Sequence, residues 1–204
     1  MSSLYSIDLL KELSDGFEED GYTAEQVKAL RAHGRLTAML GVLRGTHEIR
    51  PIDHIIDLAV PCKLPFNGAE RVSPAKSGVV KLEKHGDDLY LDGVKLALFL
   101  SEKQKGGKVI GGHDLRKELE AKGGNVSASI LDKCVESPAL WPESWKKDDQ
   151  GGTIYVYFWD DIFRVSHGDL CVRYGYWHEG RMVSDFRWLG RDWRGRNPSA
   201  SLAS

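Results

Sequence analysis

The first quarter of the chain has apolar residues at helical spacing. They recur every three or four positions between residues 7 and 17, which predicts a short amphipathic helix. Thr23 and Gln26 then fit a capping box, in which each side chain bonds the backbone N–H of the other residue. This pair predicts a second helix that continues to a stop near Gly45.

The middle of the chain changes to patterns that are typical of strands. The β-branched content of Ile52–Leu58 favours a strand over another helical turn, and Val79–Glu83 predicts a further strand. Leu89–Leu91 and Val94–Leu100 flank the dipeptide Asp92-Gly93. Because a type I′ turn needs two residues that tolerate positive φ, this arrangement predicts a β-hairpin.

The second half predicts a helix pair followed by a meander. Helices are expected at His113–Lys122 and Ser127–Ser137, and strands at Thr153–Val165, Leu170–Trp177 and Met182–Leu189. The fold class is therefore α+β, with N-terminal helices, a central β-hairpin, a helix pair and a C-terminal antiparallel aromatic-rich β-meander.

A segment rich in proline and small residues suggests the domain organisation. We expect a helical N-terminal portion at 1–60, a linker or long loop at 61–78, an α+β portion at 79–195 and a partly ordered tail at 196–204. A helical piece of this size buries little surface alone, so we favour a loosely bipartite single unit.

Charge limits the classes of partner. The chain has 28 Lys and Arg against 30 Asp and Glu, a balance that predicts no general attraction to nucleic acid or to anionic membrane. The balance is uneven, because residues 1–58 carry 6 basic and 10 acidic side chains while residues 151–204 carry 7 and 6.

The cysteines and the N-terminus indicate a compartment. Cys62, Cys134 and Cys171 are odd in number and far apart, which favours a reducing environment over a disulfide framework. No apolar run approaches the roughly 20 residues of a membrane span, and the N-terminus lacks the basic and apolar regions of a signal peptide. We expect a cytoplasmic protein.

Several motifs resemble a group of hypothetical proteins from genomes of uncultured, candidate-phylum bacteria. The motifs are Glu48–Asp57, His113–Leu119, Ile130–Asp132 with Pro138 to Trp145, Phe158–Arg164, Gly168–Trp177 and Trp188–Trp193 with Asn197-Pro198. The resemblance covers about two thirds of the chain and implies a bacterial source. It implies no activity, cofactor or partner.

Common catalytic and metal-binding motifs are missing from the sequence. The histidines and cysteines show no metal-ligand spacing, so no metal or cofactor is predicted. Gly106–Gly112 precedes a helix, but it matches neither a dinucleotide-binding fingerprint nor a P-loop. No nucleophile motif is present either, and we assign no catalytic residue.

The helix pair followed by strands resembles a winged helix-turn-helix in outline. Its second helix would present Asp132, Lys133 and Glu136 to DNA, and two acids with one lysine oppose phosphate binding. The C-terminal sheet offers a better candidate surface of aromatic and guanidinium side chains. The candidate binding residues are Tyr155, Tyr157, Trp159, Arg173, Trp177, Arg187 and Trp188.

The leading hypothesis is therefore a non-enzymatic recognition protein that binds a protein partner through this sheet. A nucleic-acid-binding module, either single-stranded or winged-helix-like, is the first alternative. An enzyme without recognisable motifs is the second. No membrane association is expected.

Overall fold

The computed structural model describes residues 7–30, 35–46 and 53–203 of the chain. The chain forms two compact units, Met1–Ile52 (unit 1) and Asp53–Ser204 (unit 2). The boundary thus lies ahead of the predicted linker at 61–78, and that segment belongs to unit 2. Its Cys62 and Ala69 are buried in the unit 2 core, so it is a packed loop within this unit.

Unit 1 contains helices α1 (Ile7–Glu19), α2 (Ala24–Leu30) and α3 (Arg35–Leu43). The predicted capping box is present at the start of α2, where Thr23 N donates to Gln26 Oε1 at 2.7 Å and Gln26 N donates to Thr23 Oγ1 at 3.2 Å. The single helix expected from there to Gly45 crosses residues 31–34, which lie outside the described residues. The flanking parts are helical as α2 and α3.

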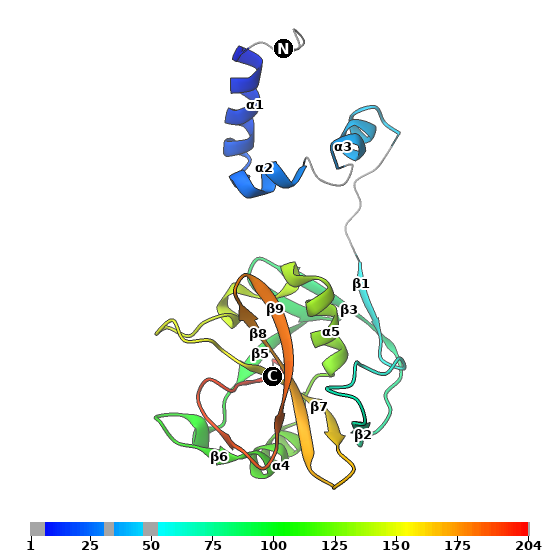
Figure 1. Cartoon of the computed structure of the whole chain (residues 1–204), viewed down its shortest axis with the longest axis vertical. Helices are drawn as coiled ribbons and strands as arrows, with labels where there is room; N and C mark the ends of the chain where they lie inside the picture. Colours follow the sequence, from blue (N-terminus) through cyan, green and yellow to red (C-terminus); the bar gives the residue numbers. More distant parts are fainter. Residues whose placement is uncertain (1–6, 31–34, 47–52, 204) are drawn as a thin grey trace. The chain divides into compact units, whose positions relative to one another are not determined.

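Unit 2 is an α+β structure built on a large curled sheet (Figure 1). Within residues 53–203 the strand order is β1-β3-β4-β5-β11-β7-β8-β9, β2 pairs with β7, and β6 pairs with β10 in a separate small sheet. The strands are β1 His54–Asp57, β2 Glu70–Arg71, β3 Val79–His85, β4 Asp88–Leu91, β5 Val94–Phe99, β6 Ile110–Gly111, β7 Val156–Arg164, β8 Leu170–His178, β9 Arg181–Trp188, β10 Asp192–Trp193 and β11 Ser199–Leu202.

The local signals for the central hairpin correspond to real elements. β4 and β5 pair antiparallel, and the two residues between them have positive φ, 49° at Asp92 and 76° at Gly93. Both residues therefore adopt the backbone conformation that a type I′ turn requires. The predicted meander is present as β7, β8 and β9, which pair antiparallel in sequence order.

The C-terminal segment is a central strand, which corrects the expectation of a partly ordered tail at 196–204. β11 lies between β5 and β7, antiparallel to the first and parallel to the second. Ser199, Ala200 and Ser201 are all buried. The small side chains fit because both neighbouring strands and the layers above and below leave little space at this position.

Helices cover both faces of the sheet. On one face, α5 (Ala128–Glu136) and the 3₁₀ turns η2 (Pro138–Leu140) and η3 (Glu143–Trp145) form a core with the buried Trp141 and Trp145. On the other face, α4 (Gly112–Lys122) contributes Leu115 and Leu119 to a second core. Because β7 and β8 are covered on both sides, most of their side chains are buried whichever face they point to.

Candidate recognition surface

The seven residues predicted to form one binding surface lie on two different faces of the sheet. Strand alternation places Tyr155, Tyr157, Trp159 and Arg187 on the α4 face, whereas Arg173, Trp177 and Trp188 belong to the α5 face. Tyr157, Trp159 and Arg173 are buried, with exposed fractions of 1%, 4% and 4%. The structure therefore does not bring the seven together on one exposed surface.

Arg173 is occupied inside the protein. Its Nη2 donates to Asp132 Oδ1 on α5 at 2.7 Å and to Ser184 Oγ at 2.8 Å, and its Nη1 donates to the carbonyl of Lys63 at 2.9 Å. Asp132 in turn accepts from the backbone N–H of Lys63 at 2.7 Å. This buried pair fixes α5 and the 61–78 loop against β8.

The other residues of the α5 face differ in how accessible they are. Trp177 lies under the ammonium of Lys146, which is 3.8 Å from the ring centroid. Trp188 packs edge-on against Phe186, with ring centroids 5.2 Å apart, and remains partly exposed near the end of β9. Trp188 also lines a surface cleft.

The segment Gly190–Asn197, here named the arginine loop, crosses the α4 face directly after β9. Its centre is Trp193, which is fully buried. The Trp193 ring lies 4.2 Å from that of Tyr157 and 4.8 Å from that of Trp159, and the Arg187 guanidinium lies 5.5 Å from it on the way to solvent. The buried aromatic residues of the predicted surface thus anchor this loop.

Hydrogen bonds fix the backbone of the arginine loop along its length. The Arg191 carbonyl accepts from Gly112 N at 3.1 Å, and the Asp192 carbonyl accepts from Arg187 Nη2 at 2.8 Å. Farther on, the buried side chain of Gln104 donates to the carbonyls of Arg194 and Asn197 at 3.1 and 2.9 Å. The loop backbone is consequently tied to α4, to β9 and to Gln104.

Three arginine side chains project from this fixed backbone. Arg191, Arg194 and Arg196 are all exposed. Arg196 pairs with Asp148 at 2.5 Å, whereas neither Arg191 nor Arg194 forms an ion pair with any described residue. Two guanidinium groups on an ordered loop are therefore available to a ligand.

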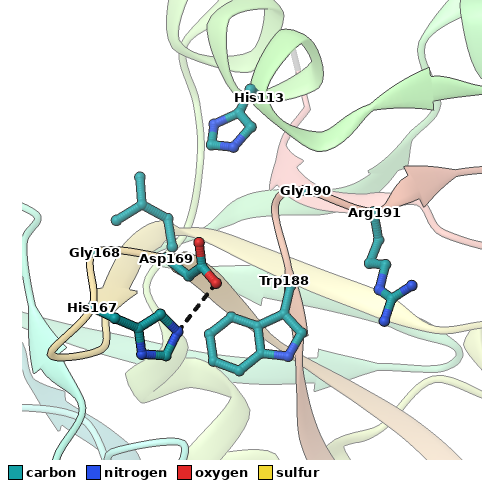
Figure 2. Close-up of a pocket in the computed structure, with 8 residues that line it drawn as sticks. His113, His167, Gly168, Asp169, Trp188, Gly190 and Arg191 are labelled. Atoms are coloured by element: carbon teal, nitrogen blue, oxygen red, sulfur yellow. Dashed lines mark hydrogen bonds and ion pairs between the residues drawn. The ribbon is translucent and has the colours of Figure 1, made fainter.

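A cleft of about 720 Å³ lies at the start of the arginine loop (Figure 2). Its side chains come from three parts of the fold. His113 lies in the first turn of α4, His167 and Asp169 belong to the β7–β8 turn, and Trp188 ends β9 with Arg191 just after it. Nε2 of His167 and Oδ2 of Asp169 are 3.2 Å apart. The cleft, here the Trp188 cleft, combines an aromatic ring with the Arg191 guanidinium and two imidazoles, a combination suited to an anionic ligand that has an apolar part.

A second cleft of about 870 Å³ lies at the other end of the loop. Arg194 and Arg196 line it together with Tyr155, Lys105 and Asp148. The Asp148 pKa is held below its usual range by the hydrogen bond from Arg196 and by backbone N–H donors of Gly152 and Gln150. One loop thus contributes arginines to two neighbouring clefts.

The thiols are poorly suited to nucleophilic chemistry. Cys62, Cys134 and Cys171 are buried, and burial raises the pKa of each to about 12. A thiol with such a pKa is protonated at neutral pH, and the thiolate is the reactive form.

Among the described residues, no group of three His, Cys, Asp or Glu side chains is arranged to hold a metal ion. In the same part of the chain, no helix is long and apolar enough to cross a membrane.

Comparison with known proteins adds no family to this picture. No protein-family model matches the chain, and neither a curated protein nor a solved structure matches it.

Proposed function

We propose that unit 2 is a non-catalytic recognition module that binds an acidic segment of a partner protein through the arginine loop and the Trp188 cleft. The observation that supports this proposal is a contrast between the backbone and the side chains of the arginine loop. Its backbone is fixed by Trp193 and by hydrogen bonds, while Arg191 and Arg194 are exposed and have no ionic partner among the described residues. Because the backbone is already fixed, only the arginine side chains lose entropy when they bind a carboxylate, and the planar guanidinium fork matches that group.

Charge favours a protein partner over a nucleic acid. In unit 2, Lys and Arg equal Asp and Glu in number. Asp169 lies in the Trp188 cleft, and Asp148 and Asp149 lie in the second. These carboxylates would repel a continuous phosphate backbone, whose affinity depends on many cations acting together. Discrete carboxylates on a peptide can instead be placed opposite individual arginines.

Single-stranded nucleic acid is a second candidate, and one observation favours it. Trp188 and Arg191 line the same cleft, so a base could stack on the indole while its phosphate meets the guanidinium. Such a complex would use the same residues as the acidic peptide.

The two partners can be separated with labelled probes and the full chain. Fluorescence anisotropy would be measured with an acidic peptide rich in Glu and Phe, with the same peptide carrying Gln for Glu, and with a single-stranded RNA of mixed sequence, at about 50 mM salt. We expect the acidic peptide to bind and its Gln analogue to fail. Tighter binding of the RNA, with a steep salt dependence, would replace the first candidate by the second. Binding of neither probe would remove both.

A further inference from the structure

Unit 1 contains an apolar groove between its first two helices. The groove has a volume of about 460 Å³, and Leu13 and Phe17 of α1 face Tyr22 and Val27 across it. Phe17 and Tyr22 pack edge-on with ring centroids 5.4 Å apart, and this contact closes one side of the groove. Leu13 and Tyr22 are nonetheless 56% and 44% exposed. Apolar side chains gathered in a concave surface at this exposure are typical of a docking site for another helix.

The third helix of the same unit has a complementary shape. Met39, Leu40 and Leu43 of α3 are 41%, 42% and 83% exposed. Their spacing puts them along one side of the helix. An apolar helical ridge and an apolar groove are thus both open in a unit that is too small to bury them alone.

The charges around these two patches are opposite in sign. Residues 7–28, which form α1 and most of α2, carry seven Asp or Glu against two Lys. Glu18 and Lys28 line the groove itself, and Lys28 is paired with Glu25 at 3.2 Å. Between residues 26 and 47 there is no Asp or Glu, and Arg35 and Arg44 lie at the two ends of α3. The rim of the groove is therefore acidic in net charge, and the α3 segment is basic.

We propose that the chain self-associates through unit 1, with α3 of one copy bound in the α1–α2 groove of a second copy. Reciprocal exchange closes a symmetric dimer, because each copy supplies one groove and one ridge. Two grooves facing each other would bring like charges together, and an anionic membrane would be repelled by the acidic rim. The other helices of the chain, α4 and α5, bury their apolar residues in unit 2 and have no free ridge to offer.

Light scattering and sedimentation of the full chain over micromolar concentrations test this proposal. We expect a mass twice that of the 22.8 kDa chain at high concentration. Leu13→Ser in the groove and Leu43→Ser on the ridge should each raise the dimer dissociation constant by at least about tenfold. Val79→Ser is the matched control, since Val79 is 63% exposed but lies in unit 2, and it should change the constant by less than about twofold.

Mixing the two weakened variants gives a sharper result. In a mixed pair, the intact groove of the Leu43→Ser chain meets the intact ridge of the Leu13→Ser chain, so one of the two contacts is restored. We expect heterodimers at concentrations where neither variant dimerises alone. Failure of the mixture to dimerise would overturn the reciprocal arrangement. A wild-type chain that stays monomeric throughout would overturn the proposal, including the case in which α3 binds its own groove or a different protein occupies it.

Discussion

Arg173 on β8 and Asp132 on α5 form an ion pair, with Nη2 and Oδ1 2.7 Å apart, in which both side chains are almost completely buried. The charge of each side chain offsets the free-energy cost of removing the other charge from water. Arg173→Met should therefore lower the free energy of unfolding by about 3–5 kcal/mol, because Asp132 would remain buried without a partner. Urea unfolding followed by tryptophan fluorescence measures the change.

The double variant Arg173→Met with Asp132→Leu is the control for this prediction. Since an apolar pair of similar size leaves no buried charge, it should recover at least half of the loss. A loss below about 1 kcal/mol in the single variant would show that the pair is not a major determinant of stability.

Gly112 is a site where the arginine loop allows no side chain. A Cβ at this position would collide with the Trp193 indole nitrogen and would lie 2.5 Å from the carbonyl oxygen of Leu189 and 2.9 Å from its Cα. Because the backbone and a fully buried ring cannot move aside easily, Gly112→Ala should destabilise the protein by about 2–4 kcal/mol and loosen the loop. Thermal unfolding by calorimetry provides the measurement.

Gly190→Ala is the matched control on the same loop. A Cβ there meets no atom within 4 Å, and Gly190 is not among the residues with positive φ. This variant should unfold within a few degrees of the wild type. Equal destabilisation by the two substitutions would contradict the close approach of α4 to Trp193.

The C-terminal strand provides a prediction about truncation. A chain ending at Pro198 lacks β11, which leaves the facing edges of β5 and β7 unpaired in the middle of the sheet. We expect this chain to lose its tertiary structure and to aggregate, as judged by near-ultraviolet circular dichroism. A chain ending at Ala203 keeps the strand and the hydrogen bond from Ala203 N to the Lys95 carbonyl, so it should fold normally. Normal folding of the shorter chain would refute the position of β11.

The cysteines should be inert while the protein is folded. Burial raises the pKa of each thiol to about 12, and a raised thiol pKa keeps the group neutral up to that pH. At about pH 8, Ellman's reagent should therefore react slowly with the native protein and rapidly, at all three sites, in denaturant. Rapid reaction of one thiol in the native state would identify an exposed, activated cysteine and would revive the hypothesis of an enzyme.

Local features of the fold were predictable from sequence, because their causes are local. The Thr23–Gln26 capping box and the Asp92-Gly93 turn each depend on residues within a few positions of one another. Alternation along β8 is a local feature too, and it divides the side chains of the strand between the two faces of the sheet. It could not show that both faces are covered, and for that reason Arg173 and Trp159 were expected at a surface.

The features that sequence reasoning missed depend on contacts between distant segments. Ser199–Leu202 has little intrinsic preference for a strand and becomes one because β5 and β7 pair with it. Arg196 and Asn197, the end of the arginine loop, were placed in the expected tail at 196–204 for the same reason. A single large aromatic residue, Trp193, among glycines and arginines was the one local sign that this segment is anchored.

We propose above that the exposed arginines of the loop bind an anionic partner. The most direct test measures the dissociation constant of the acidic peptide for Arg191→Ala with Arg194→Ala and for Arg181→Ala. Arg181 is also exposed and begins β9 of the same sheet, but it lines neither cleft. We predict that the double variant weakens binding by at least about tenfold while Arg181→Ala changes it by less than about twofold. Equal effects of the two, or unchanged binding by the double variant, would contradict it.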